Sequence, residues 1–390
     1  MNVRPESAVR ARVGGWGAAG AVLGLVSAWW AGAGTAVVWS ALLAGAALPM
    51  WCLEWRRRES ATEGGADRKG ALLGVAVITA LQAVILFLQL SMGGDHGAAV
   101  AFALPLLPVA GLAMLIVAAV SPQVLGETFP ATGRAFSQLA TLRRPDAAGL
   151  TALLGWCVKC FFLPLMLGWS WSWLAGLEYR LPEERHLYFY IVGMALLYAV
   201  DTAFGVIGYV STARCLGGEI RSVDRTLLGW VSALACYPPL SVLVLDTWLI
   251  SRNAHHWRQW LDDGSVVSIL WGGAILLLTA IYTWSTVAFG LRFSNLTHRG
   301  VITHGPYRWS KHPAYISKNL SWWLISVPFL TTAGAGTAVA SCLAMLAVNA
   351  IYWLRARTEE RHLRHDPVYC EYAAWIAREG LLAWCLRRGR

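Results

Sequence analysis

Residues Asn319–Leu354 read NLSWWLISVPFLTTAGAGTAVASCLAMLAVNAIYWL and form an apolar block of 36 residues. A membrane-spanning helix needs about 20 predominantly apolar residues, so this block is too long for one helix. Gly334 and Gly336 lie near its middle, and glycine is typical of a turn between two periodic segments. The block therefore predicts a tight hairpin of two membrane helices.

Eight further apolar stretches precede this hairpin, and each is long enough to cross the hydrocarbon core of a bilayer. With the hairpin they predict an all-α, polytopic membrane bundle of about ten transmembrane helices. The eight stretches are Trp16–Gly32, Thr35–Leu53, Ala71–Leu90, Ala98–Val120, Thr151–Leu174, Leu187–Val210, Leu227–Ile250 and Val266–Leu291.

The composition of the whole chain agrees with a membrane protein. Of its 390 residues, 57% are hydrophobic and 14% are charged, and the mean hydropathy is +0.50. A soluble globular protein carries roughly 25% charged residues, so this chain could not cover a water-facing surface. The eight cysteines are scattered, mostly inside apolar runs, which excludes a disulfide scaffold.

The net charge of +10 follows a pattern expected for membrane topology rather than for nucleic-acid binding. With a cytoplasmic N-terminus, the basic loops all fall on one side of the membrane. The other side receives the Ala33–Gly34 turn, the Asp95–His96 turn and the acidic Glu178–Arg185 loop. We therefore expect an integral protein of a bacterial inner membrane with both termini cytoplasmic, as is the Arg292–Lys318 segment. We expect membrane lipids, and no nucleic acid, as partners.

Few ionisable residues lie inside the predicted spans, and such residues are the first functional candidates in a membrane protein. Asp201 lies in the middle of a span, either as a packed, hydrogen-bonded group or as part of the wall of an acceptor cavity. Lys159 and Asp246 are close enough to span ends to reach the interface.

Two sets of metal-ligand residue types are interpreted structurally. The Cys157-Val-Lys-Cys160 spacing has no second cysteine pair and no histidine cluster beside it, and His255 and His256 fall on a predicted outer loop. We therefore expect no metal site.

Polar residues concentrate instead in the C-terminal third. The segment Arg292–Lys318 reads RFSNLTHRGVITHGPYRWSKHPAYISK and holds three of the nine histidines. Gly305-Pro306 predicts a turn, and His312-Pro313 favours a helix that starts at the proline. Such a helix start leaves backbone N–H groups free at a cytoplasmic pocket, where they suit a ligand carboxylate.

A second charged segment follows the hairpin. Residues Arg355–Trp375 read RARTEERHLRHDPVYCEYAAW. Asp366 and Pro367 predict the N-cap and first position of a helix, and helical spacing places Tyr369 and Tyr372 on one face of it. On composition alone this segment is typical of a solvated cap on a membrane helix.

Taken in order, these motifs resemble the isoprenylcysteine carboxyl methyltransferase family, whose pattern phospholipid methyltransferases share. The resemblance covers roughly Val266–Trp375, so we divide the chain into an N-terminal bundle (1–265) and a catalytic domain (266–390). The motifs that carry it are Gly305-Pro306-Tyr307, then Lys311-His312-Pro313-Ala314-Tyr315, the helical hairpin, Arg357-Thr358-Glu359-Glu360, and Tyr369-x-x-Tyr372.

The resemblance implies an S-adenosylmethionine-dependent membrane methyltransferase with a cytoplasmic cofactor pocket and a lipophilic acceptor that enters from the bilayer. It makes His312 and Glu360 the candidate catalytic residues, with His312 either binding the cofactor or removing a proton from the acceptor. The residues that it places in the cofactor pocket are Tyr307, His312, Pro313, Tyr315, Arg357, Glu359, Glu360, Tyr369 and Tyr372.

Two other functions remain open at this stage. An NADPH-dependent membrane reductase of the sterol reductase type would need basic residues for the 2′-phosphate, and Arg308, Lys311 and Arg361 could supply them. A non-enzymatic transporter or scaffold would spread polar residues through the spans instead of gathering them at one cytoplasmic face. The sequence does not predict the oligomeric state.

Overall fold

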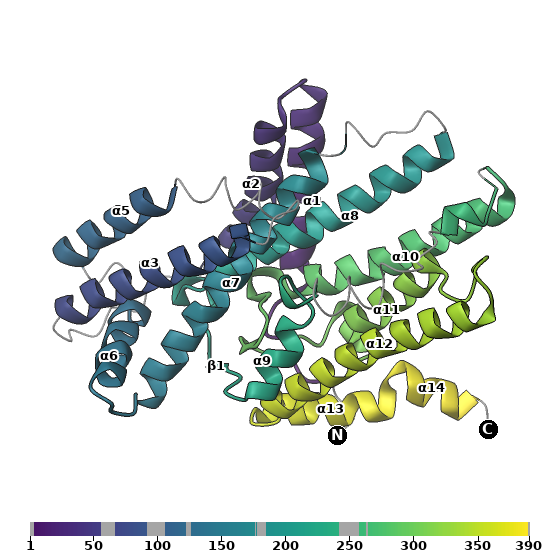
Figure 1. Ribbon diagram of the computed structural model, residues 1–390. Coiled ribbons are helices and arrows are strands. Elements are labelled where there is room, and N and C mark those ends of the chain that lie inside the picture. The colour runs from purple at the N-terminus through teal and green to yellow at the C-terminus, as the bar shows by residue number, and fades with distance from the viewer. Residues whose placement is uncertain are drawn as a thin grey trace.

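Helices dominate the part of the chain that the computed structural model describes, which comprises residues 4–55, 67–91, 106–121, 126–175, 177, 185–241, 257–262 and 264–388. Seven described helices are long and apolar enough to cross a membrane, so the protein is an integral membrane protein (Figure 1). They are α1 (Ala11–Trp30), α2 (Thr35–Glu54), α3 (Arg68–Ser91), α7 (Ala147–Ala175), α8 (Arg185–Val210), α10 (Val266–Phe289) and α12 (Ala335–Leu363).

Of the other predicted spans, one is described only in part and one differs from the expectation. Of Ala98–Val120, the described part is the 15-residue helix α5 (Leu106–Val120), and residues 98–105 lie outside the described ranges. The prediction of one helix over Leu227–Ile250 is wrong, because α9 (Leu227–Leu234) ends after eight residues. Pro238 and Pro239 follow; proline has no N–H to donate and disfavours helical backbone in the residue before it. Residues 242–250 lie outside the described ranges.

The predicted C-terminal pair of helices is confirmed, but of the two only α12 is long and apolar enough to span a membrane. It consists of α11 (Pro313–Ser326) and α12, and α11 begins at the proline that the sequence indicated. Gly334 precedes α12 with a φ of +94°, a conformation that a side chain would strain. At 14 residues α11 is shorter than a typical span, whereas α12 continues past the apolar block to Leu363.

Two helices follow the hairpin, α13 (Pro367–Glu379) and α14 (Leu381–Arg388). The Asp366 side chain accepts a hydrogen bond of 2.9 Å from the Val368 N–H, which confirms the predicted N-cap. Figure 1 shows α13 and α14 at the same end of the molecule as the N-terminus.

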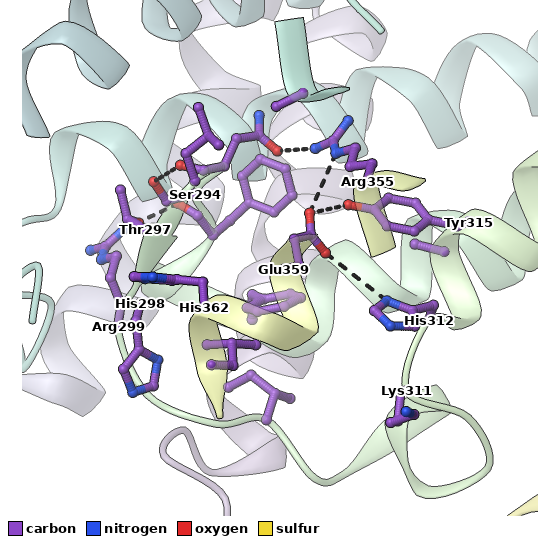
Figure 2. A pocket seen from close by; sticks show the side chains of 18 of the residues that line it. Ser294, Thr297, His298, Arg299, Lys311, His312, Tyr315, Arg355, Glu359 and His362 are labelled. Atoms are coloured by element: carbon purple, nitrogen blue, oxygen red, sulfur yellow. Dashed lines mark hydrogen bonds and ion pairs between the residues drawn. The ribbon is translucent and has the colours of Figure 1, made fainter. Parts of the chain in front are cut away.

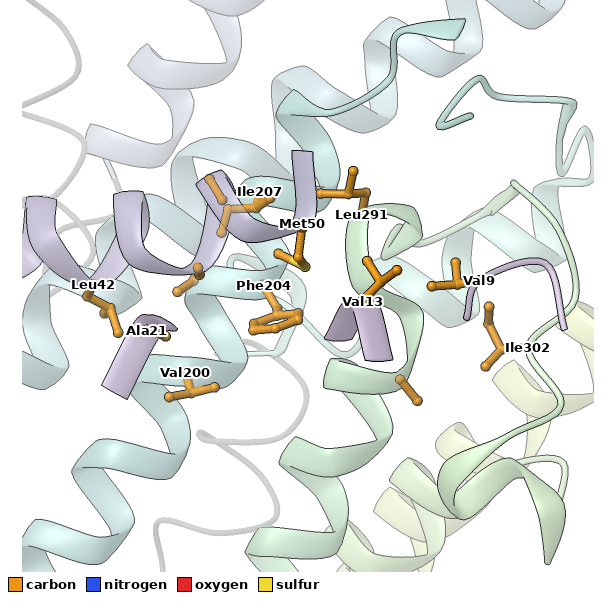
Figure 3. Packing of buried hydrophobic residues seen from close by; sticks show 14 of the residues in the cluster. Val9, Val13, Ala21, Leu42, Met50, Val200, Phe204, Ile207, Leu291 and Ile302 are labelled. Atoms are coloured by element: carbon orange, nitrogen blue, oxygen red, sulfur yellow. The ribbon is translucent and has the colours of Figure 1, made fainter. Parts of the chain in front are cut away.

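The N-terminal bundle packs through small residues. A Cβ added to Gly20 of α1 would lie 2.1 Å from the carbonyl oxygen of Gly45 in α2, so this approach requires glycine. Inside a bilayer the hydrophobic effect does not drive helices together, so van der Waals packing at such close contacts stabilises the helix pair instead. The hairpin of α1 and α2 packs on α8, where Met50, Phe204 and Leu291 meet in one buried cluster (Figure 3).

The helix α6 (Thr128–Ala140) packs on α3 and α7 within the N-terminal bundle.

Short elements connect the bundle to the C-terminal third. The strands β1 (Ser222–Val223) and β2 (Thr297–His298) form an antiparallel pair that joins the connection after α8 to the one after α10. The 3-10 helices are η2 (Arg214–Leu216), η4 (Trp257–Gln259), η5 (Gly290–Arg292) and η6 (Gly305–Arg308). The last of these forms the turn predicted at Gly305-Pro306.

The first described residues lie along the loop before η6. We call residues 4–9 the N-terminal strap. The Ala8 N–H donates to the carbonyl oxygen of Val301 at 2.9 Å, and Ser7 Oγ lies 2.9 Å from Nδ1 of His304. The strap thereby ties the N-terminus of the chain to the C-terminal third.

Candidate active site

A cavity lies among the C-terminal elements, between α12, α11, α13 and the connection from η5 to η6. The ends of α9 and α10 contribute the rest of its wall. Figure 2 shows charged and aromatic side chains from these separate segments pointing into one space. The elements positioned by the hairpin and by the β1–β2 pair therefore meet at a single site.

A buried arginine and a glutamate of α12 organise the cavity wall. The Arg355 side chain is 5% exposed; its Nη2 donates to Asn295 Oδ1 at 2.5 Å and its Nε donates to Glu359 Oε1 at 3.3 Å. The Tyr315 hydroxyl donates to the same Glu359 oxygen (Figure 2). Because Arg355 and Tyr315 both donate to it, the Glu359 carboxylate is held in one place at the cavity.

Aromatic rings and an amide support this arginine. The Arg355 guanidinium lies 5.1 Å from the ring centroid of Tyr315 and 5.5 Å from that of Tyr237. Asn295 Nδ2 donates to the Tyr209 hydroxyl at 2.8 Å and to the Tyr237 hydroxyl at 3.2 Å. The wall is therefore anchored to α8 through Tyr209 as well as to α12.

His312 is fixed by the second glutamate of the pair. Its ring stacks on Tyr315, with 5.6 Å between centroids and 5° between planes. Its Nε2 lies 2.9 Å from Glu360 Oε1, which also accepts from Lys311 Nζ at 2.6 Å. His312 Nδ1 lies 4.0 Å from Glu359 Oε2, so the other ring nitrogen faces the carboxylate that lines the cavity (Figure 2).

The helix α13 covers one side of the cavity. The Tyr372 hydroxyl donates to the Tyr307 carbonyl oxygen at 2.7 Å, and His298 Nε2 lies 2.6 Å from Asp366 Oδ2 at the start of the helix. Burial raises the pKa of Tyr369 and of Tyr372, so both phenols stay protonated. Burial lowers the pKa of His298, and the Asp366 carboxylate opposes this effect.

Six of the residues predicted for the pocket line the cavity, and three do not. Glu360 is 8% exposed and faces Lys311 and His312; Pro313 starts α11; Arg357 is 57% exposed and lies against the Trp353 ring. The six that line the cavity are Tyr307, His312, Tyr315, Glu359, Tyr369 and Tyr372.

The sequence reasoning missed Arg355 and Asn295. Helical spacing could have found the arginine, because Tyr352, Arg355 and Glu359 lie at i, i+3 and i+7 and so share one face of α12. Arg357 lies two positions from Arg355 and hence on another face. No local pattern marks Asn295, which sits in a connection before β2.

Two buried hydroxyls of the cavity wall have no hydrogen-bond partner within the described ranges. They are Tyr369 Oη and Thr297 Oγ1. A buried polar atom without a partner costs free energy, so native proteins usually satisfy such groups with water or a ligand. Both atoms therefore fit a cavity that takes a polar molecule.

The inner end of the cavity contains a lysine inside an aromatic box. Lys318 Nζ lies 5.2, 5.1 and 5.7 Å from the ring centroids of Tyr282, Trp322 and Tyr352. Asp201 is buried as a hydrogen-bonded group, and it accepts from Tyr282 Oη at 2.9 Å and from Thr286 Oγ1 at 2.5 Å. Asp201 thereby fixes two side chains that line the cavity, and it lies outside the cavity wall itself.

The remaining candidates from the sequence either make contacts away from the cavity or lie outside the described ranges. Lys159 Nζ donates to Thr212 Oγ1 at 2.7 Å and sits 3.9 Å from the Trp156 ring centroid. Cys157 and Cys160 are free thiols, and no group of residues that could hold a metal occurs in the described part of the chain. Asp246, His255 and His256 lie outside that part, as do the Asp95–His96 turn and most of the Glu178–Arg185 loop.

Comparison with known families supports the resemblance read from the motifs. Residues 266–365 match the model of the Isoprenylcysteine carboxyl methyltransferase (ICMT) family. The match includes α10, the hairpin and the charged end of α12, and it ends before α13. No curated protein and no solved structure matches the chain.

Proposed function

We propose that the protein is an S-adenosylmethionine-dependent methyltransferase that methylates a lipophilic acceptor drawn from the bilayer. The observation that carries this proposal is Glu359, a carboxylate at the cavity wall that Arg355 and Tyr315 hold within the family-matched region. A carboxylate in this position is a partner for the ammonium or the ribose hydroxyls of the cofactor.

The chemistry of the cavity fits this cofactor, which supplies an electrophilic methyl group on a sulfonium. Aromatic faces attract a sulfonium by cation–π contact worth about 0.5–2 kcal/mol, and Tyr307, Tyr315 and Tyr372 line the cavity. The hydroxyls of Thr297 and Tyr369, which lack partners in the described structure, offer hydrogen bonds to its polar groups.

The residues of this chain act mainly by positioning. Methyl transfer is an in-line displacement, and correct orientation of the two reactants can lower the barrier of such a reaction by roughly 7–11 kcal/mol. Glu360 orients His312, which keeps its second nitrogen for the cofactor or for a proton of the acceptor. The tyrosines of α13 keep water away from the reacting atoms.

The positions of three basic residues favour this proposal over an NADPH-dependent reductase. Lys311 bonds to Glu360 at 2.6 Å, and Arg361 Nη2 donates to Thr226 Oγ1 at 2.6 Å. Arg308 is exposed and lies over the Trp309 ring. The three cations therefore do not converge on one phosphate. The polar groups also gather at one end of the bundle, which does not favour a transporter.

The charge pattern of the loops supports a cytoplasmic position for the cavity and for both termini. We therefore assign cofactor entry to the cytosol and acceptor entry to the membrane, with residues 1–265 as accessory bundle and 266–390 as catalytic domain.

The test is ligand binding to the purified full-length protein in detergent. S-adenosylmethionine and NADPH are titrated separately by calorimetry against the wild type, Glu359→Gln and His312→Ala, with the exposed Glu371→Gln as a matched control. We expect micromolar affinity for S-adenosylmethionine only, at least tenfold weaker in the first two variants and unchanged in the control. Binding of NADPH alone would show a reductase, and binding of neither would refute the proposal.

A further inference from the structure

The last helix, α14, exposes an apolar face that the described residues leave uncovered. Leu381, Leu382 and Leu386 are 55%, 75% and 64% exposed. At 3.6 residues per turn these leucines and Cys385 lie within an arc of about 140°, so they share one face of the helix. A helix of 8 residues is too short to be stable in water by itself, so this face indicates a surface on which α14 packs.

Contacts of Trp309 place the start of α14 at the edge of the membrane-spanning bundle. The Leu381 N–H donates to the Trp309 carbonyl oxygen at 2.9 Å. The Trp309 ring meets that of Trp284 in α10 edge-on, with 5.7 Å between centroids, and the two residues are 42% and 45% exposed. Trp284 lies one turn before the end of α10, and exposed tryptophans near span ends are typical of the membrane–water interface. The helix α14 therefore begins beside the place where α10 leaves the bilayer.

Basic residues flank the apolar face. The stretch from Arg378 to Arg390 contains four arginines and one glutamate. Within the described ranges, the exposed Arg378 side chain makes no ion pair, and Arg387, 57% exposed, pairs with Glu379 at 3.1 Å. An apolar helix face with arginines beside it is typical of a helix that lies in the interface of a membrane with anionic lipids.

The joint between α13 and α14 is tight. A Cβ added to Gly380 would lie 2.6 Å from the Ile376 carbonyl oxygen and 3.0 Å from that of Trp309, so this approach requires glycine. Across the joint, Arg387 Nη2 donates to the Arg378 carbonyl oxygen at 2.5 Å. A surface that holds α14 therefore also holds α13, which covers the cavity.

We propose that α14 docks on the bilayer leaflet nearest the end of α10, with its leucines among the acyl chains and its arginines at anionic phospholipid headgroups. This contact does not depend on the proposed methyltransferase function. It gives the helix that covers the cavity an anchor outside the protein, so the lipid composition of the leaflet acts on the position of α13.

The test places a small fluorescent label, nitrobenzoxadiazole, on Cys385 in the full-length protein in nanodiscs. Cys52, Cys370 and Cys385 are the exposed cysteines of the described part, so Cys52→Ser with Cys370→Ser directs the label to Cys385. The matched control, Cys52→Ser with Cys385→Ser, carries the label on Cys370 of α13, beside the exposed Glu371. Quenching by a phospholipid with a doxyl group near its headgroup measures contact with the leaflet, and quenching by iodide measures contact with water.

We expect the doxyl lipid to quench the label on Cys385 at least threefold more strongly than the label on Cys370, and iodide to show the opposite order. Leu382→Glu places a carboxylate on the apolar face and should weaken lipid quenching at Cys385 at least twofold. Ala374→Glu places the same group on an exposed position of α13 and should leave it unchanged.

The choice of an anionic surface is tested by lipid composition. Replacing part of the phosphatidylcholine by phosphatidylglycerol should strengthen lipid quenching at Cys385 at least twofold. The gain should be lost when Arg378 and Arg387 are both changed to glutamine and kept when both are changed to lysine. Equal quenching with and without phosphatidylglycerol would overturn the anionic partner.

Two other results would overturn the docking itself. Equal quenching of the two labels by iodide would show that α14 is a solvated cap. Shielding of the Cys385 label from both quenchers would show that a protein, such as a second copy of this chain, covers the apolar face instead of lipid.

Discussion

The cavity wall on α12 and the hairpin of α1 and α2 are stabilised in opposite ways. The wall depends on paired polar groups, in which the buried Arg355 joins the buried Asn295 and the partly exposed Glu359. The hairpin depends on the absence of side chains where Gly20 meets Gly45. The wall should therefore be destabilised when a polar side-chain group is removed, whereas the hairpin should be destabilised when a side-chain atom is added.

The largest effect should come from Arg355→Met. Removing the guanidinium takes the cation from the partly exposed Glu359 carboxylate and leaves the buried Asn295 Oδ1 without its donor. Leaving a buried acceptor without its hydrogen bond costs about 1–3 kcal/mol, and more for a charged group. We expect a lower free energy of unfolding in detergent and a loss of methyl transfer above about 100-fold, measured by thermal unfolding and by transfer from radiolabelled S-adenosylmethionine.

Arg357→Met is the matched control on the same helix. Its guanidinium is 57% exposed and lies 3.9 Å from Glu360, and exposed pairs contribute about 0–1 kcal/mol. Methyl transfer should stay within about twofold of the wild type. Equal losses from the two substitutions would contradict the assignment of Arg355 to the cavity wall.

The next effect should come from Gly20→Ala. The added methyl would lie 2.1 Å from a backbone oxygen of α2, so the helices must separate, and overpacking of this kind costs about 1–3 kcal/mol. In Gly15→Ala of the same helix, the new methyl has no atom within 4 Å, and the helix should gain about 0.5–1 kcal/mol. Thermal unfolding measures both, and a similar change in the two would refute close packing at Gly20.

Ser7→Ala links the two regions and should have a smaller effect. It removes the hydroxyl that contacts His304 Nδ1 and accepts from the Thr303 N–H. A typical hydrogen bond contributes about 0.5–1.5 kcal/mol to the free energy of unfolding. Because this loop continues into the cavity wall, the dissociation constant of S-adenosylmethionine should rise severalfold by calorimetry. Glu6→Ala, an exposed neighbour, should leave it unchanged, and a rise in that control would indicate a general defect of the strap.

The smallest effect concerns pH. Burial lowers the pKa of His298 below the value of about 6.5 expected when α13 opens. Above pH 6.5 the ring is neutral in both states, so the docked helix keeps its full stability. As the pH falls through 6.5, the exposed ring takes a proton more readily, which favours opening. Cofactor affinity should fall by less than about tenfold from pH 7.5 to 5.5, and His298→Asn should flatten the curve.

Apolar length and helix signals predicted most of the fold from the sequence. The hairpin, the start of α11 at Pro313 and the Asp366 cap follow from local chemistry that the structure retains. The same rules could have predicted the end of α9 before Pro238-Pro239. The prediction of one helix over Leu227–Ile250 instead followed the apolar character of the whole stretch.

The candidate site was less accessible to sequence reasoning. Motif order located Glu359 and His312, but the choice between Arg355 and Arg357 needed the helix face as well as the spacing. Asn295 and the N-terminal strap depend on contacts between segments far apart in the chain, which no local pattern records.

The strap also has a consequence for biosynthesis. Ser7 and His304 are 297 residues apart, so the strap leaves the ribosome well before the residue that it contacts. At a rate of synthesis of about 5–20 residues per second, His304 is made about 15–60 s after the strap. During that interval the loop before η6 does not yet exist, and the strap has no docking site. An N-terminal truncation would therefore act as a late assembly defect, which leaves membrane insertion of the early helices intact while the last third lacks its closing contact.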